Sequence, residues 1–226
     1  MEDERLLKQY SGEGARSYDR TRGESDRFRA EEAAFTELFA IARPTSVLDC
    51  PFGTGRWISH YKDSAAQVVG IDLSADMLKE AQSKVDSAGL RNVRLVQGSI
   101  FDQGLFGPQL GRFNLAVCVR FLNWIESSKL REGMRNLDRV AQNHVIIGVS
   151  VVPSKTSFLR RLRMRRALSR INALRIAEGK SPQHVHREDS VLSCFASLQW
   201  EPLRRIEIFE NETRVNYFYL LRVRRH

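Results

Sequence analysis

Two aspartates and a glycine turn form the clearest chemical pattern in this sequence. Asp49 ends a short apolar run and precedes the turn Gly53-Thr54-Gly55, and Asp72 ends a second apolar run about twenty residues after the turn. In a parallel sheet, such a turn presents backbone amides to a nucleotide-like ligand, and the second acid offers a carboxylate to a ribose diol. The spacing therefore predicts a site for a nucleoside-containing cofactor.

Two common nucleotide motifs do not fit this turn. A dinucleotide-binding fold requires a third small residue in the pattern G-x-G-x-x-G, whereas Arg56, Trp57 and Ile58 follow Gly55 here. The P-loop pattern G-x-x-x-x-G-K-[ST] has no match in the chain. A pyrophosphate is thereby disfavoured, and S-adenosyl-L-methionine is the remaining common interpretation.

The motifs resemble those of the class I (Rossmann-like) S-adenosylmethionine-dependent methyltransferases, small-molecule type. Residues 47–57 are similar to their motif I, roughly D-x-G-x-G-x-G, and residues 71–74, 95–102 and 113–119 resemble the second, third and fourth motifs. The chain departs from the family at Pro51, which stands at the first glycine of the pattern. Because proline fixes φ near about −65° and has no N–H, Gly53 and Gly55 are expected to make the close approach to the cofactor.

The resemblance implies roles for residues at the carboxyl ends of the strands, where ligands bind in such sheets. The glycine turn would approach the methionine part of the cofactor, Asp72 its ribose hydroxyls and Leu73 its adenine. Ser99 stands where many relatives have an acid, and would flank the base together with Ile100. The predicted cofactor-binding set is Asp49, Gly53, Thr54, Gly55, Asp72, Leu73, Met77, Ser99, Ile100 and Val119.

The resemblance also implies an acceptor side to the site. Methyl transfer from a sulfonium is an in-line displacement that depends largely on alignment, and a general base is needed only when the acceptor must lose a proton. His184 and His186 are the predicted bases, because histidine titrates near neutral pH, and Tyr10 and Tyr18 are further candidates. A surface or helix-entry position without a catalytic role is the alternative for either histidine. Arg120 either pairs with a carboxylate or phosphate of a ligand or forms a salt bridge to a neighbouring helix. The predicted acceptor-binding residues are Tyr10, Tyr18, Arg120 and Trp124.

Signatures of several acceptor classes are absent from the sequence. No Asn/Asp-Pro-Pro-aromatic stretch or Pro-Cys or Thr-Cys nucleophile follows the fourth strand, and the paired glutamates of protein-arginine methyltransferases are missing. There is also no carboxylate cluster suited to Mg²⁺, so no metal is predicted. We therefore predict transfer to an O or N atom of a small-molecule or saccharide-like acceptor, with an anionic acceptor as one option. Two alternatives remain open: an RNA methyltransferase or RNA-binding protein, and a cofactor-binding scaffold without turnover.

The positive charge of the chain is concentrated in one segment. The 226 residues carry a formal net charge of +9, and residues 159–175 contain no acid while apolar residues recur among the arginines at mostly helical spacing. This predicts a basic helix that either contacts an anionic surface or nucleic acid, or packs its apolar stripe on the domain.

The acidic N-terminus lacks a signal-like apolar segment, which favours a cytoplasmic location. Three widely spaced cysteines predict buried thiols, and the oligomeric state stays open.

Alternating strand and helix patterns predict one α/β domain. Residues 1–28 are expected to form an N-terminal cap or arm, and residues 29–226 the methyltransferase domain, with a basic lid-like insertion at about 153–186. Helices are predicted over 29–42, 55–61, 75–88, 127–141 and 188–198, and strands over 46–50, 67–71, 93–97, 113–119, 144–151, 203–209 and 216–224. The predicted fold is a doubly wound, mostly parallel seven-stranded sheet with an antiparallel C-terminal hairpin edge.

Overall fold

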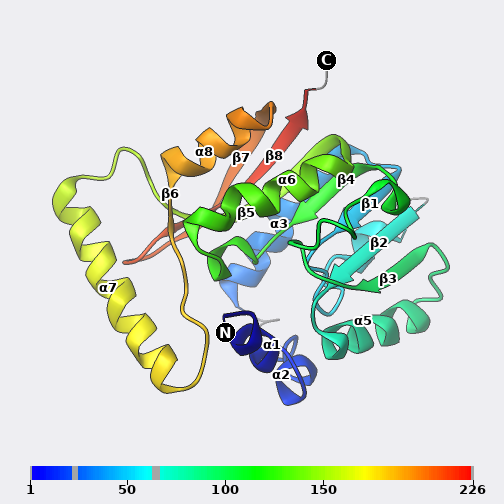
Figure 1. Ribbon diagram of the computed structural model, residues 1–226, viewed down its shortest axis with the longest axis horizontal. Helices are drawn as coiled ribbons and strands as arrows, with labels where there is room; N and C mark the ends of the chain where they lie inside the picture. The colour runs from blue at the N-terminus through cyan, green and yellow to red at the C-terminus, as the bar shows by residue number, and fades with distance from the viewer. Residues whose placement is uncertain (1, 22–24, 63–66, 225–226) are drawn as a thin grey trace.

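A mixed β-sheet in the order β3-β2-β1-β4-β5-β8-β7 forms the centre of the computed structural model, which describes residues 2–21, 25–62 and 67–224 (Figure 1). β1 pairs in parallel with β2 and β4, and the next pairs outward, β2–β3 and β4–β5, are parallel too. β8 is inserted antiparallel between β5 and β7. The strands are β1 (Ser46–Asp49), β2 (Gln67–Asp72), β3 (Val93–Gln97), β4 (Phe113–Cys118), β5 (Ala141–Val152), β6 (His186–Arg187), β7 (Trp200–Glu210) and β8 (Val215–Val223).

This topology confirms the predicted doubly wound sheet with an antiparallel hairpin edge. The two-residue strand β6, which pairs in parallel with the end of β5, adds one strand to the seven predicted. It was missed because two residues carry no periodic pattern. Pro202 lies in β7, the edge strand, where the missing N–H of proline is tolerated.

Helices cover both faces of the sheet. One apolar cluster joins α3 to the sheet through Phe35 and Leu38, and it continues into α4 and α5. The other cluster joins α6 and α8 to the opposite face through Met134 and Phe195. Side chains alternate along the strands, so that Val47 belongs to the first cluster and Leu48 to the second. The helices are α1 (Glu2–Gln9), α2 (Glu13–Arg16), α3 (Asp26–Ala42), α4 (Ile58–Tyr61), α5 (Ala75–Ser87), α6 (Leu130–Val140), α7 (Phe158–Ala177) and α8 (Glu188–Ser197).

Several element boundaries differ from the predicted ones. α4 begins at Ile58 and not at residue 55, because Gly55 has a φ of +72° that an α-helix does not accommodate. Residues 127–129 form a separate 3₁₀ turn before α6 begins at Leu130. β5 begins at Ala141, directly after α6, and β7 begins at Trp200. These ends are set by tertiary pairing with β4 and β8, which local propensity does not report.

The N-terminal arm is fastened to the start of α5. The backbone N–H of Gly12 donates to Oδ2 of Asp76 at 2.7 Å, and the Ser74 hydroxyl donates to the carbonyl oxygen of Tyr10, also at 2.7 Å. Ser74 also caps α5 by accepting from the N–H of Met77, as its position before the helix predicts. Of the predicted arm, residues 1 and 22–24 lie outside the described residues. Through the hydrogen bonds to Ser74 and Asp76, the arm with its helices α1 and α2 lies against the carboxyl edge of the sheet.

α7 stands at one side of the molecule, away from the sheet (Figure 1). Ser157 caps its first turn, and Met164 is its buried residue. Within the described ranges, no helix combines the length and the apolar character needed to cross a membrane. The basic segment is thus a helix that stands apart from the sheet and packs along one side only.

Candidate cofactor and acceptor site

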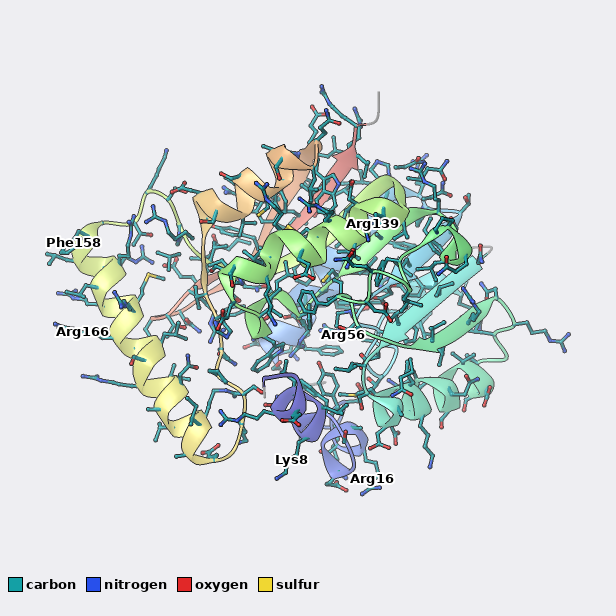
Figure 2. The ribbon with its side chains drawn as sticks, viewed as in Figure 1. Lys8, Arg16, Arg56, Arg139, Phe158 and Arg166 are labelled. Atoms are coloured by element: carbon teal, nitrogen blue, oxygen red, sulfur yellow. The ribbon has the colours of Figure 1, made fainter. Side chains whose placement is uncertain are left out.

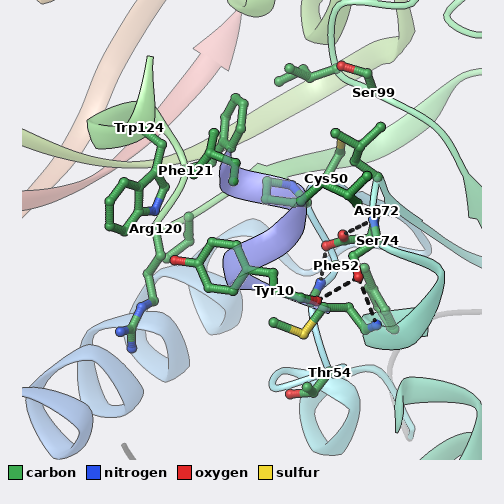
Figure 3. Close-up of a pocket in the computed structure, with 18 of the residues that line it drawn as sticks. Tyr10, Cys50, Phe52, Thr54, Asp72, Ser74, Ser99, Arg120, Phe121 and Trp124 are labelled. Atoms are coloured by element: carbon green, nitrogen blue, oxygen red, sulfur yellow. Dashed lines mark hydrogen bonds between the residues drawn. The ribbon is translucent and has the colours of Figure 1, made fainter. Parts of the chain in front are cut away.

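A pocket lies at the carboxyl ends of β1, β2 and β4, where ligands bind in sheets of this kind. The sheet contributes its glycine turn and strand ends, and the N-terminal arm contributes a second wall. Figure 3 shows Tyr10 between Arg120 and Trp124 on one side and Asp72 and Ser74 on the other. Predicted residues that line the pocket are Tyr10, Tyr18, Gly53, Thr54, Asp72, Leu73, Met77, Ser99, Ile100, Val119, Arg120 and Trp124.

The glycine turn has the backbone conformation that the sequence predicts. Gly53 and Gly55 have φ values of +58° and +72°, a region that residues with a Cβ rarely adopt. Gly53 lines the pocket, whereas Gly55 is not among the lining residues, and a Cβ there would lie 2.5 Å from Cδ1 of Ile58. Gly55 therefore shapes the turn, and its predicted direct contact with the cofactor is not supported.

The two motif aspartates take different positions. Asp72 lines the pocket, and its carboxylate accepts from the N–H groups of Gly53 at 2.8 Å and Ser74 at 2.9 Å. Asp49 lies behind the turn, is not a lining residue, and accepts from the hydroxyl of Tyr61 at 2.8 Å. Its predicted cofactor contact is therefore corrected to a buried structural role.

Burial dominates the electrostatics of both carboxyl groups. Burial raises the pKa of Asp49 to about 8, against the opposing hydrogen bond from Tyr61. Burial also raises the pKa of Asp72, although the N–H groups of Ser74 and Gly53 favour its charged form. The backbone donors thus oppose the effect of burial on Asp72, whose side-chain oxygens lie at the pocket wall.

The residues around Asp72 fit an adenosine group. Leu73, Met77, Ile100 and Phe101 form an apolar stretch of the wall on which a planar base can lie. The hydroxyl of Ser99 accepts from the N–H of Phe101 at 3.2 Å, which holds the loop after β3 in place. S-adenosylmethionine needs a hydrogen-bond acceptor for its ribose hydroxyls, room for its methionine part and an apolar slot for its adenine. The Asp72 carboxylate, the open glycine turn and this apolar stretch of the wall offer these three features.

The opposite wall is aromatic and belongs largely to the arm. The rings of Tyr10 and Tyr18 meet edge to face with centroids 5.9 Å apart, and Tyr10 meets Trp124 in the same way at 6.2 Å. The guanidinium of Arg175, at the far end of α7, lies 5.0 Å from the ring centre of Trp124 and donates to Oε1 of Gln9. The arm and α7 therefore meet at this wall.

A buried ion-pair network supports Arg120. Glu31 of α3 is fully buried and binds Arg27 at 2.9 Å, Arg120 at 3.0 Å and Arg56. Burial alone would raise the pKa of Glu31, but the three guanidinium groups outweigh it and lower that pKa. Arg120 has a φ of +63°, a strained conformation for a residue with a side chain and one that is common at binding sites. Arg120 thus forms the predicted salt bridge to a neighbouring helix and also lines the pocket, while its pairing with a ligand stays a prediction.

Positive charge exceeds negative charge beside this wall. Glu32 adds a second carboxylate 3.8 Å from Arg56. On the other side, Arg214 is buried, and burial together with the charges of Arg27 and Arg175 lowers its pKa to about 10. Crowded arginines with few carboxylates favour binding of an anion.

Neither predicted histidine lines the pocket. His186 is fully buried; its Nε2 lies 2.7 Å from the carbonyl oxygen of Leu122 and its Nδ1 lies 2.9 Å from the Ser127 hydroxyl. Burial lowers the pKa of His186. The backbone N–H of His184 donates to the carbonyl oxygen of Asn123. Both residues join the segment after α7 to the loop after β4, so the geometry does not support their prediction as general bases.

The pocket contains residues that the sequence interpretation missed. Glu31, which pairs with Arg120 and is not itself a lining residue, carried a usable signal, because it falls on the apolar stripe of α3 with Phe35 and Leu38, where an acid indicates a buried ion pair. Leu6 and Leu7 carried no such signal in the sequence, because their position at the pocket depends on how the arm packs. The other missed lining residues are Cys50, Pro51, Phe52, Arg56, Trp57, Ser74, Gly98, Phe101 and Phe121. Within the described ranges, no group of three or more His, Cys, Asp or Glu side chains could hold a metal ion.

Comparison with known proteins agrees with this geometry. Residues 47–144 match the protein family described as "Methyltransferase domain". A dTDP-3-amino-3,6-dideoxy-alpha-D-glucopyranose N,N-dimethyltransferase from Streptomyces fradiae is 37% identical over 86 residues, which cover 37% of this chain and 34% of that protein. The chain therefore matches only a third of the length of this curated relative.

Solved methyltransferase structures share the fold over nearly the whole chain. Magnesium protoporphyrin IX methyltransferase from Synechocystis with bound S-adenosylmethionine has a TM-score of 0.72 at 13% identity, over 99% of this chain and 98% of that one. The N-methyltransferase NodS from Bradyrhizobium japonicum in complex with S-adenosyl-L-homocysteine has a TM-score of 0.63 at 11% identity, over 88% and 89%. Residues 47–144 thus match a methyltransferase domain, and the chain as a whole has the fold of structures solved with S-adenosylmethionine or S-adenosyl-L-homocysteine bound.

Proposed function

We propose that the protein transfers a methyl group from S-adenosylmethionine to an O or N atom of a small, saccharide-like acceptor that carries an anionic group. The observation that carries this proposal is Arg120, held at the pocket wall by the buried Glu31 and flanked by Tyr10, Tyr18 and Trp124. A guanidinium there can bind a carboxylate or phosphate through two parallel hydrogen bonds. The aromatic rings can pack on the faces of a sugar or another ring.

The residues of the chain supply alignment and exclusion of water. When bound, S-adenosylmethionine supplies an electrophilic methyl group, and such a displacement is accelerated mainly by holding the acceptor atom close and in line. The pocket wall that contains Asp72, Leu73 and Ile100 would hold the adenosine group. The N-terminal arm would close over the reacting centre. Tyr10 and Tyr18 are the proton-handling groups at the arm wall, and an amine acceptor that is already neutral needs no base.

One relative supports this acceptor class without fixing it. The Streptomyces fradiae relative acts, by its name, on a dTDP-linked amino sugar, which combines a saccharide, an amine and a diphosphate. Beside Arg120, the charges of Arg27, Arg175 and Arg214 would attract such an anion. The cytoplasmic location expected from the sequence stays a prediction.

The test uses labelled S-adenosylmethionine with a panel of acceptors: amino-sugar nucleotides, neutral amino sugars, aromatic acids and RNA fragments. We expect labelling of an anionic acceptor, and we expect Arg120→Gln to raise its KM about 10- to 100-fold, the range for a lost charge-assisted hydrogen bond. Affinity for S-adenosylhomocysteine should stay unchanged. The matched control is Arg135→Gln, which removes an exposed arginine of α6 and should leave KM unchanged.

Other outcomes would overturn the proposal. Labelling of neutral sugars in preference to anionic ones would remove the role of Arg120. Labelling of RNA alone would support an RNA methyltransferase. Tight binding of S-adenosylhomocysteine with no acceptor labelled in the panel or in cell extracts would support the non-catalytic scaffold.

A further inference from the structure

α7 carries the most exposed large apolar side chains of the described part of the chain. The exposed fraction is 77% for Phe158, 67% for Leu159 and 67% for Leu174. Figure 2 shows the helix at the side of the molecule, with Phe158 and Arg166 labelled on it. Single exposed apolar residues are ordinary on a surface, but a group of them on one helix marks a contact surface.

The inward side of α7 is already used by the fold. Residues at helical spacing, Arg161, Met164, Leu168, Ile171 and Arg175, are buried or half-buried. Arg175 at the end of this row makes the contacts with Trp124 and Gln9 described above. The inward row therefore fixes how α7 is placed against the protein.

The outward side forms a second row at the same spacing. Leu159, Arg163, Arg166, Arg170 and Leu174 follow one another at intervals of three or four residues, and all five are exposed. We call these five residues the outer stripe. It places three guanidinium groups between two exposed leucines, with Phe158 beside the first of them.

The charge of the outer stripe is not balanced within the protein. The sequence of α7 contains seven arginines and no acid. Arg160 pairs with Glu210, whereas no ion pair with another described residue is formed by Arg163, Arg166 or Arg170. The outer stripe is therefore complementary to an anionic surface.

We propose that the outer stripe docks the protein on a membrane surface that contains anionic lipids. Basic side chains are attracted to anionic headgroups, while leucine and phenylalanine side chains gain by entering the boundary between headgroups and acyl chains. A nucleic acid would pair with the arginines but would leave Phe158, Leu159 and Leu174 in water. The combination of the two residue types on one exposed row therefore favours a lipid surface over nucleic acid.

Vesicle co-sedimentation of the full chain tests this docking. We expect binding to vesicles of phosphatidylcholine mixed with phosphatidylglycerol, little binding to phosphatidylcholine alone, and loss of binding as salt is added. The triple variant Arg163→Gln, Arg166→Gln, Arg170→Gln should lose about 100-fold in partitioning. The double variant Leu159→Ser, Leu174→Ser should also bind more weakly. Both should bind S-adenosylhomocysteine like the unmodified protein, since the pocket contacts of α7 belong to its inward row.

A second triple variant separates the outer stripe from net charge. Arg91→Gln, Arg94→Gln, Arg135→Gln removes three exposed arginines from other elements and should leave vesicle binding unchanged. The proposal is overturned if this control loses as much binding as the α7 triple, or if the unmodified protein does not bind anionic vesicles at low salt. Binding to an RNA oligonucleotide that needs the arginines but not the leucines, without vesicle binding, would assign the stripe to nucleic acid instead.

Discussion

The two walls of the pocket are built in different ways. The cofactor wall comes from strand ends and the turns that follow them, and backbone N–H groups hold its key carboxylate, Asp72. The arm wall brings together Tyr10, Glu31, Arg120 and Arg175, which belong to four distant segments. The proposed cofactor side is thus encoded locally, whereas the proposed acceptor side depends on long-range packing.

The walls should also differ in stability. α1 and α2 have eight and four residues, too few to persist without tertiary contacts. Apart from the bonds to Ser74 and Asp76, the arm is held by Asp19, which accepts from the Thr54 hydroxyl at 2.8 Å and pairs with Lys84 at 2.6 Å. We expect the arm to open for ligand exchange while the cofactor wall stays formed.

The largest effect is expected from the glycine turn. Gly55→Val should abolish cofactor binding, because a β-branched residue at a φ of +72° is strained and its Cβ would meet Ile58. Gly53→Val should do the same at the pocket wall, whereas Pro51→Gly should be comparatively mild. Calorimetric titration with S-adenosylhomocysteine measures all three. A greater loss in Pro51→Gly than in either glycine variant would mean that the motif is aligned wrongly.

Asp72→Ala should weaken cofactor binding by about 1.5–3 kcal/mol, the usual range for hydrogen bonds to a charged group. The same titration measures it, with circular dichroism to confirm that the variant is folded. An unchanged affinity in a folded variant would contradict the assignment of Asp72 to the ribose. Asp86→Ala, which removes an exposed acid of α5, is the control.

A smaller effect is expected at the arm. Asp19→Ala removes the bonds to Thr54 and to the partly exposed Lys84, and should destabilise arm closure by about 1 kcal/mol. Stopped-flow displacement should show faster cofactor dissociation with little change in association. If dissociation stays as slow as in the unmodified protein, the arm is not held by Asp19.

The smallest effect on cofactor binding is expected from Asp49→Asn, because Asp49 does not line the pocket and the variant acts on folding stability. The folded-state pKa of Asp49 is raised from 3.8 to about 8 by burial, so the proton it retains stabilises the fold fully below about pH 4, and this contribution is lost as the pH rises towards 8. Tyr61 and Asp72 lie beside the Asp49 carboxyl group. The side-chain oxygen of asparagine can still accept a hydrogen bond from the Tyr61 hydroxyl. Urea unfolding across this range should show a shallower decline in the free energy of unfolding in the variant. Parallel curves for the two proteins would contradict the raised pKa.

Residue patterns placed most of the predicted cofactor residues at one pocket wall, because this information is local. The conformation of the glycine turn and the position of Asp72 at the end of β2 follow from neighbouring residues and general topology rules, while their contacts with the cofactor stay a prediction. His186 could not be placed in this way, since its partners Leu122 and Ser127 lie about sixty residues away in the sequence. For α7, the periodicity predicted the helix but not which of its leucines faces the protein, because both rows contain apolar residues.

A crystal structure with S-adenosylhomocysteine would test the division into two walls most directly. We predict that the ribose hydroxyls lie within hydrogen-bond distance of the Asp72 carboxylate, that the adenine lies along Leu73 and Ile100, and that the sulfur faces the arm wall, with the space beside Arg120 left for the acceptor. An adenosine group bound against Arg120 and Trp124, with Asp72 out of reach of the ribose, would contradict the account.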